Sequence, residues 1–412
     1  MAGACAVAQD AGDGRVRAPD AGAGALVVPG AVDPSFGQRG IVALPVPGVE
    51  PRGMVVAPDG TIVIVGSVFV DATSSFEGYV FRLLGDGSLD ASFDGGGVHR
   101  IAGRNVSALS VALGPTGEIV VGGACDCEPS ARIWRLRPDG SPDPGFASGG
   151  ELALDAEAAF IDNVSVEPDG AIRALGLAMT EGLYAARVLG DGRLDHGGVV
   201  PVGDFILHAA TPGRDGSWIL GGAVDTSPED RGRTTRTTDL ARIAPDGTLD
   251  LGFGSGGFVA LDADDLSTAV IVGDRVLLGL GRYDDEPTAR SRVEARLADG
   301  RLDEGFGQGG ATDLGRAANV FAILAHADGA LEVVAGDERQ LAIHRRRAGG
   351  AALGEPWRSS LPDRVWLDHL AVALDPRSGD LLAAAIQHHR VLDAAGTPWW
   401  RVAGTGLFRV PR

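Results

Sequence analysis

The stretch Arg242–Gly257, RIAPDGTLDLGFGSGG, decides the fold of this chain, because imperfect copies of it recur along most of the 412 residues. Each copy carries an Asp that is usually followed three residues later by Phe, and these Asp residues are Asp33, Asp90, Asp143, Asp195, Asp250 and Asp303. Successive Asp residues are 57, 53, 52, 55 and 53 residues apart. A period of about 54 residues indicates an array of similar structural units.

A second signature, typified by Pro-Asp-Gly at 58–60 and 168–170, alternates with the first. Apolar segments enter and leave it, as Met54–Val56 and Ile62–Val65 do around Ala57–Gly60. Pro presets the backbone of a tight turn and Gly accepts a left-handed conformation, so each copy predicts a β-hairpin. There are seven copies, at 57–60, 114–117, 167–170, 213–216, 271–274, 325–329 and 375–379. The fifth departs from the pattern, because Gly273-Asp274 replaces Pro-Asp-Gly.

Each period therefore predicts four short strands. In the first unit we expect them at Ile41–Val46, Arg52–Ala57, Thr61–Phe69 and Tyr79–Leu84. No segment shows a helical period over three turns. The predicted fold is an all-β, seven-bladed β-propeller of four-stranded antiparallel blades over residues 26–412.

The two ends of the array are irregular. In the last unit, His388–Leu392 and Trp399–Val402 compete to be the fourth strand, and whether Leu26–Val28 closes the ring stays open. Residues 1–25 are rich in Ala, Gly and Asp and predict a flexible linker. Met1–Cys5 is similar to the tail of a bacterial lipoprotein signal, so a tether remnant with a lipid anchor at Cys5 is an alternative to a plain disordered terminus.

The composition excludes several classes of partner and chemistry. A formal net charge of −19 argues against nucleic acid as a partner. All 36 basic residues are Arg, which excludes Schiff-base lysine chemistry and a phosphate-binding Gly-Lys-Ser/Thr loop. No apolar run reaches the roughly 20 residues of a membrane span. We expect a monomer.

The cysteines form no disulfide framework, since only Cys5, Cys125 and Cys127 are present. Cys125 and Cys127 are separated by one residue, where zinc and redox pairs have two. We favour two ordinary loop thiols over a local disulfide, and a disulfide over a metal pair. The eight His residues show no shared spacing and no His-Glu-x-x-His motif, so we predict no catalytic residues.

The repeated residues are better explained as contacts that hold neighbouring blades together, which we call joints, than as functional sites. An Arg precedes the signature Asp by eight residues in four units, which predicts ion pairs Arg82–Asp90, Arg135–Asp143, Arg187–Asp195 and Arg242–Asp250. The signature aromatic residues should be buried between blades, and these are Phe36, Phe93, Phe146, Phe253 and Phe306. A ring of Ca²⁺ sites at the signature carboxylates is the alternative, although no Asp-x-Asp-x-Asp-Gly loop is present.

These motifs resemble the delta-60 repeat, a family found in bacterial proteins that are often secreted or displayed on the surface. The resemblance covers about Asp33 to Gly310 clearly and the remainder weakly. It implies a propeller fold and an extracytoplasmic location but no particular activity. The copy at Leu194–Gly198 departs from the family pattern because it has lost its Phe.

Function should lie where the chain does not repeat. In a meander the two signature turns leave one face, so the variable loops share the opposite face, and loops that vary on a fixed frame are where binding residues gather. An equally weighted alternative is that the sequences of these loops vary because no function constrains them. The candidate binding residues are Asp71, Phe76, Glu77, Asp126, Glu128, Arg231, Arg233, Arg236, Tyr283, Asp284 and Asp285.

The leading functional hypothesis is a non-enzymatic, extracytoplasmic scaffold that binds a protein or glycan through this face. One rival is a lyase-type or hydrolase-type enzyme with a site in the axial pocket of the propeller. Another is a structural protein stabilised by Ca²⁺, the one cofactor that the signature carboxylates suggest. An enzyme needs convergent polar side chains at one pocket, whereas a binding protein needs an exposed apolar or aromatic patch.

Overall fold

The computed structural model describes residues 32–70, 72–155, 157–180, 182–203, 205–225, 236–263, 266–281, 290–315, 319–336, 340–360, 365–392 and 398–412. The predicted linker at 1–25, with Cys5, and the strand expected at Leu26–Val28 lie outside these residues. By their contacts the described residues fall into two compact units. One unit is 200–360, and the other is 32–199 with 365–412. The described parts contain strands and turns but no helix.

The larger unit holds four sheets and the smaller unit three. The strands of the four-sheet unit are β1 (Ile41–Ala43), β2 (Glu50–Val56), β3 (Ile62–Val70), β4 (Ser75–Leu83), β5 (Val98–Arg100), β6 (Ser107–Leu113), β7 (Ile119–Ala124), β8 (Ala131–Leu136), β9 (Glu151–Ala153), β10 (Ala158–Val166), β11 (Ile172–Ala178), β12 (Leu183–Val188), β13 (Leu194–Val200), β26 (Val365–Leu374), β27 (Leu381–Leu392) and β28 (Pro398–Val410).

The strands of the three-sheet unit are β14 (Phe205–Pro212), β15 (Trp218–Asp225), β16 (Arg236–Ile243), β17 (Phe258–Leu261), β18 (Leu266–Val272), β19 (Arg275–Leu280), β20 (Ser291–Leu297), β21 (Ala311–Gly315), β22 (Asn319–Ala325), β23 (Leu331–Gly336), β24 (Gln340–Arg346) and β25 (Trp357–Ser360). All seven sheets are four-stranded. The fold is an all-β, seven-bladed β-propeller, which confirms the predicted fold class. Blades 1 to 6 begin at β2, β6, β10, β14, β18 and β22, and blade 7 contains β26, β27, β28 and β1.

The predicted phase of the repeat was wrong. Blade 1 begins at β2, and β1, expected as its first strand, belongs to blade 7. The signature around Asp90 and Phe93 makes the third connection inside a blade: Asp90 N–H donates to the Arg82 carbonyl at 3.0 Å, and Arg82 N–H donates to the Gly97 carbonyl at 2.9 Å. The chain thus reverses, and the short strand that follows pairs back onto the same sheet.

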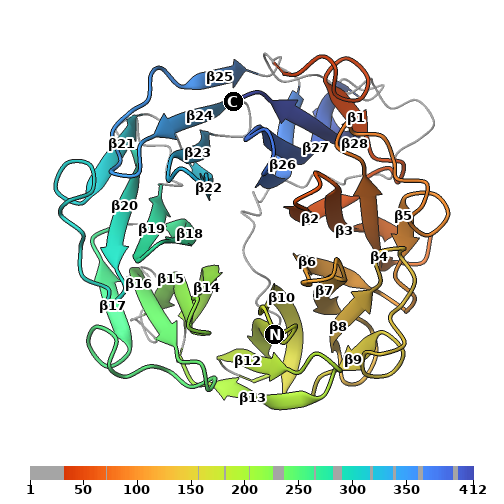
Figure 1. Cartoon of the computed structure of the whole chain (residues 1–412), viewed down its shortest axis with the longest axis horizontal. Helices are drawn as coiled ribbons and strands as arrows, with labels where there is room; N and C mark the ends of the chain where they lie inside the picture. Colours follow the sequence, from red (N-terminus) through yellow and green to blue (C-terminus); the bar gives the residue numbers. More distant parts are fainter. Residues whose placement is uncertain are drawn as a thin grey trace. The chain divides into compact units, whose positions relative to one another are not determined.

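The ends of the chain share blade 7. β1 pairs with β28 through Ile41 and Phe408, and Figure 1 shows the two strands side by side. The first signature copy completes this blade, because Asp33 N–H donates to the Arg409 carbonyl at 2.9 Å. The segments His388–Leu392 and Trp399–Val402 do not provide its fourth strand. They pair with each other within β27 and β28, and β1 is the fourth strand.

The predicted ion pairs of the signature residues form, each within one blade, and the signature Phe side chains are buried as predicted. The four Arg–Asp pairs all form, at 3.2, 2.8, 3.0 and 3.6 Å in chain order. The five signature Phe side chains are at most 2% exposed. A Cβ on Gly140, in the next blade's turn, would come within 3.0 Å of the Phe93 ring. The Gly of the repeated Asp-Gly therefore leaves room for the Phe side chain of the preceding blade.

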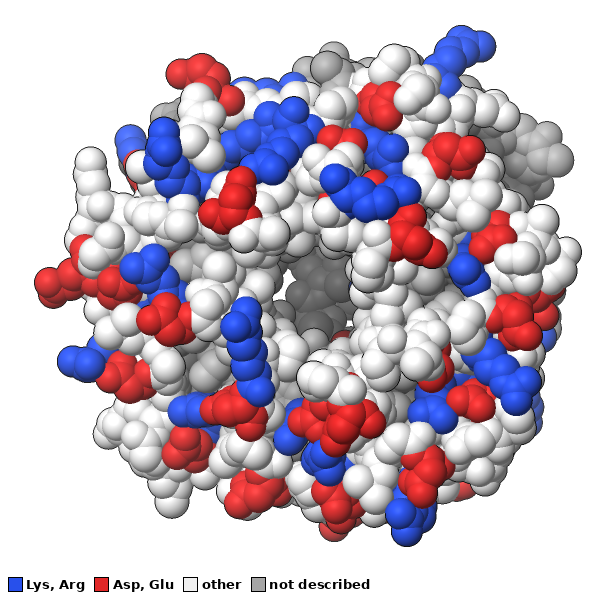
Figure 2. Space-filling model, in the orientation of Figure 1, with Lys and Arg blue, Asp and Glu red and all other residues white. Residues whose placement is uncertain are grey.

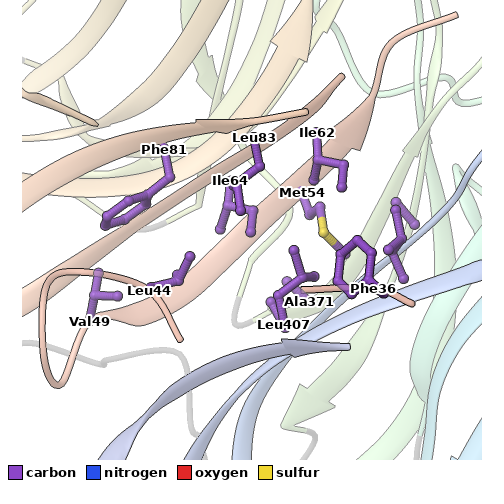
Figure 3. Packing of buried hydrophobic residues seen from close by; sticks show 13 residues of the cluster. Phe36, Leu44, Val49, Met54, Ile62, Ile64, Phe81, Leu83, Ala371 and Leu407 are labelled. Atoms are coloured by element: carbon purple, nitrogen blue, oxygen red, sulfur yellow. The ribbon is translucent and has the colours of Figure 1, made fainter. Parts of the chain in front are cut away.

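The core consists of separate layers between neighbouring blades. Figure 3 shows the layer between blades 7 and 1, where Phe36 packs near Met54 and Leu407. The second strands are covered on both sides, and Ile62 to Ser67 of β3 are therefore all buried. Full burial of a Leu, Ile or Phe side chain contributes roughly 1.5–3 kcal/mol, so these layers are the main stabilising element of each unit.

Antiparallel pairing separates two ends in every blade. The first and third connections leave one end, and the second connection leaves the other. The Pro-Asp-Gly turns and the signature turns are the first and third connections, so we call their end the turn face. The second connections and the links between blades form the variable-loop face.

Candidate functional site

The described part of the variable-loop face retains four of the predicted binding residues, Phe76, Glu77, Asp126 and Glu128. Arg236 begins β16, but its side chain is outside the described part. The remaining candidates also lie outside the described residues, and they are Asp71, Arg231, Arg233, Tyr283, Asp284 and Asp285. The candidate site is therefore built on blades 1 and 2.

The hairpin of β3 and β4 holds an aromatic pair near its tip. Phe69 and Phe76 are cross-strand partners, with ring centroids 5.2 Å apart and planes at 64°. Such edge-to-face pairs are stabilised by the ring quadrupoles as well as by burial. Phe69 remains 46% exposed, the only described aromatic side chain among the large hydrophobic residues left exposed. Sequence reasoning missed Phe69, because its partner is defined only by the hairpin register.

The link between blades 1 and 2 connects the two predicted loops. Phe76 N–H donates to the Asn105 side-chain oxygen at 2.8 Å, and Asp126 N–H donates to the Arg104 carbonyl at 2.9 Å. The Arg104 guanidinium also lies 3.6 Å from the Asp126 carboxylate. Asn105 has a φ of 51°, a conformation that Asn tolerates better than most residues. The segment around Arg104 and Asn105 thus brings Phe76 and Asp126 into one surface.

Glu77 is held in a polar cluster beside the aromatic pair. Its carboxylate accepts hydrogen bonds from the Tyr79 hydroxyl and the Arg100 guanidinium, both at 2.6 Å. The Arg100 hydrogen bond, followed by the Tyr79 bond, lowers the pKa of Glu77 below its ordinary value. Burial, followed by the bond to Glu77, raises the pKa of Tyr79. Glu77 is therefore ionised and Tyr79 protonated at neutral pH, which gives the patch a fixed pattern of donors and acceptors.

The Cys125–Cys127 loop closes the other side of this surface. The two residues form a disulfide, so the expectation of two unpaired thiols was wrong. Cys125 is 8% exposed and packs in the layer between blades 1 and 2, whereas Asp126 and Glu128 point outward as exposed residues. The peptide bond between Glu128 and Pro129 is cis. This anchoring presents the two carboxylates on the variable-loop face.

Figure 2 shows Arg side chains interspersed with Asp and Glu side chains on the face in view. Within the described ranges, no group of three or more His, Cys, Asp and Glu side chains is arranged to hold a metal ion. No helix in the described part of the chain is both long and apolar enough to cross a membrane.

The comparisons with known proteins concern the repeats. Residues 57–93 and 114–146 match the family model described as a domain of unknown function (DUF5122) beta-propeller. The repeats are β-propeller repeats. The matched residues run from the hairpin turn to the signature Phe in blades 1 and 2, the two blades that carry the candidate site. No curated protein matches the sequence.

Solved structures of similar fold include enzymes and a protein of unknown function. A catalytically inactive virginiamycin B lyase from Staphylococcus aureus, in a structure with quinupristin, has a TM-score of 0.56 at 11% identity and covers 90% of this chain and 98% of its own. An unknown-function protein from Dyadobacter fermentans has a TM-score of 0.47 at 12% identity, with coverages of 90% and 98%. The β-propeller domain of a Pyrococcus furiosus trilobed protease has a TM-score of 0.44 at 12% identity, with coverages of 85% and 92%. At such identities the likeness is one of fold alone.

Proposed function

We propose that the protein is a binding scaffold that recognises a protein or glycan through the variable-loop face of blades 1 and 2. The observation that carries this proposal is the Phe69–Phe76 pair, with Phe69 46% exposed, in the same hairpin as the ordered Glu77–Arg100 cluster. An aromatic surface next to ordered hydrogen-bonding groups is typical of recognition sites, because it combines apolar area with directional contacts.

The different environments of side chains on the two faces support a binding role for the variable-loop face. On the turn face, Arg135 and Asp143 are committed to each other and to the joint that they close. On the variable-loop face, Phe69 reaches solvent and Arg100 remains 51% exposed. Side chains that hold the blades together are not free to bind a ligand, whereas the exposed parts of Phe69 and Arg100 can contact one.

We also propose that the repeats are of the delta-60 type and that the protein acts outside the cytoplasm. The order of motifs in the chain supports the first point, and the secreted or surface character of that family supports the second. Fractionation of the native bacterium with an antibody against this chain tests the location. Recovery of the protein with cytoplasmic markers only would refute it.

The binding role is tested with the double substitution Phe69→Ser and Phe76→Ser. Wild type and variant are immobilised and probed with a glycan array and with extracts of the native bacterium. We expect ligands that bind wild type and not the variant. Leu251→Ser is the matched control, since Leu251 is 70% exposed on a signature turn. Equal ligand profiles for wild type and the double variant would contradict the proposal.

A further inference from the structure

Blade 5 has a shorter first connection than the other blades. Only Gly273 and Asp274 join β18 to β19. The corresponding connections in the other blades have five or six residues, at 57–61, 114–118, 167–171, 213–217, 326–330 and 375–380. The space beside this turn is therefore filled by three or four fewer residues than in the other blades.

A pocket of about 190 Å³ occupies that space. The apolar side chains of Ile219, Ile271 and Val276 line it. Its charged lining comes from both blades, with Arg214, Asp215 and Arg242 on blade 4 and Asp274 and Arg275 on blade 5. Drug-sized ligands occupy pockets of about 300–1,000 Å³. This pocket therefore suits a molecule smaller than a drug-sized ligand, with an apolar part.

Two opposite charges in the lining are free. Arg214 and Asp274 are exposed, and neither has a hydrogen bond or ion pair within the described ranges. The other charges are engaged, because Arg242 lies 2.5 Å from Asp215 and Arg275 lies 2.6 Å from Asp303. One free cation from blade 4 and one free anion from blade 5 thus line the same pocket.

Arg242 adds a third unused group. In two other joints the signature Arg donates to a carbonyl of the next blade, Arg82 to Pro138 and Arg135 to Gly190. Arg242 lines the pocket, and its Nε is buried without a hydrogen-bond partner. A buried donor without a partner costs about 1–3 kcal/mol, so an acceptor entering the pocket would be stabilised there.

We propose that this pocket binds a free α-amino acid with an apolar side chain. The carboxylate of the amino acid pairs with Arg214 and the Arg242 Nε, and its ammonium pairs with Asp274. The side chain lies against Ile219, Ile271 and Val276. This site is separate from the one proposed on the variable-loop face, and neither depends on the other.

The charge balance favours a zwitterion over a simple anion or cation. The guanidinium groups of Arg242 and Arg275 are already neutralised by Asp215 and Asp303. An anion alone would leave Asp274 unpaired, and a cation alone would leave Arg214 unpaired. Only a ligand with both charges pairs with both side chains, and such charge-assisted bonds are about twice as strong as neutral ones.

The test measures binding of L-leucine to the whole chain by titration calorimetry. The comparison ligands are leucinamide, which lacks the carboxylate, 4-methylpentanoate, which lacks the ammonium, and glycine, which lacks the side chain. We expect L-leucine to bind saturably and each comparison ligand to bind about tenfold more weakly or worse. Absence of saturable L-leucine binding, or equal binding of 4-methylpentanoate, would overturn the proposal.

Two substitutions assign the charges. Arg214→Gln should weaken L-leucine about tenfold and leave leucinamide unchanged, and Asp274→Asn should weaken L-leucine about tenfold and leave 4-methylpentanoate unchanged. Both side chains are exposed, so the variants should fold, which their thermal midpoints will check. Arg193→Gln and Asp191→Asn, at an exposed turn of blade 3, are the matched controls and should bind L-leucine as wild type does. Full affinity in both pocket variants would refute the assignment.

Discussion

The joint between blades 2 and 3 and the joint between blades 4 and 5 are built from the same signature but end differently. In the first, Arg135 binds Asp143 at 2.8 Å and the Gly190 carbonyl at 2.6 Å, and its guanidinium lies 4.6 Å from the centre of the Phe146 ring. In the second, Arg242 turns to Asp215 at 2.5 Å, and a pocket lies beside it. The signature itself therefore does not decide whether a joint is closed.

The first connection of the following blade also differs between the two joints. Blade 3 has the full connection 167–171, whereas blade 5 has only Gly273 and Asp274. Arg135 of blade 2 donates to a carbonyl of the next blade, whereas Arg242 of blade 4 lines a pocket.

The largest expected effect concerns the buried ring in each joint. Phe146→Ala should lower the free energy of unfolding by about 3–5 kcal/mol, because Phe146 is fully buried and its loss leaves a closed cavity. Phe253→Ala should cost about 1 kcal/mol less, because Ile219 and Val276 of the same layer line the pocket, so this layer can relax. Urea unfolding of both variants measures the difference. Equal losses would mean that the two joints are packed alike.

The joint between blades 5 and 6 extends the comparison to a joint with a polar interior. His344 and Arg346 occupy the positions that Phe81 and Leu83 hold in blade 1, and they are 3% and 6% exposed. Burial, followed by repulsion from Arg346 and Arg358, lowers the pKa of His344 to about 4. The Asp313 carbonyl, 3.2 Å from the Arg346 guanidinium, faces the same layer.

His344 predicts a loss of stability in acid. The pKa of His344 is lower in the folded chain than in the unfolded chain. Between about pH 6.5 and 4 the unfolded state therefore binds more protons, and the free energy of unfolding decreases as the pH is lowered. One pKa unit corresponds to about 1.4 kcal/mol, so the loss across this interval is about 3 kcal/mol. Unfolding curves of wild type and His344→Leu between pH 7 and 4 measure this component. The same pH dependence in both proteins would show that His344 is not its source.

Substitution of the signature Arg in the two joints should change the free energy of unfolding by different amounts, both smaller than the effect of removing Phe146. Arg135→Gln should cost about 2–3 kcal/mol, because it leaves Asp143, 14% exposed, without its partner. Arg242→Gln should cost about 1 kcal/mol or less, because Asp215 is 54% exposed and water replaces the lost contact. Thermal and urea unfolding of the two variants test the order. A larger loss for Arg242→Gln would reverse our view of the two joints.

The repeat and its hairpins could be predicted from sequence because their signals are local. Pro and Gly fix turn conformations wherever they occur, and Asp and Phe mark the period. The phase could not be predicted, because β1 and β5 have only three residues each and carry no pattern of their own. Their pairing follows from the chain reversal between Asp90 and Gly97, which depends on backbone hydrogen bonds.

The sites were predictable only in part for a similar reason. Variable loops identified Phe76 and Glu77, but Phe69 became a candidate only through the β3–β4 register. The pocket had a sequence signal, the replacement of Pro-Asp-Gly by Gly273-Asp274. Its meaning depends on the lining from blade 4, which the sequence of one turn does not reveal.

Lengthening the short turn of blade 5 should change stability least of all these variants, although it should fill the pocket. Inserting Pro-Asp-Gly between Gly273 and Asp274 rebuilds a five-residue connection like the others. Such a turn lies on the surface, so stability should change by no more than about 0.5 kcal/mol. The added residues should fill the space beside Arg242 and abolish L-leucine binding.

The same insertion also separates pocket shape from pocket charge. Arg214 and Asp274 both remain in the inserted variant, so a charge-only site would still bind L-leucine there. Calorimetry at matched protein concentration distinguishes the two outcomes. Unchanged affinity, with an unchanged unfolding midpoint, would show that the short turn does not make the site and that the contrast between the two joints lies in Arg242 itself.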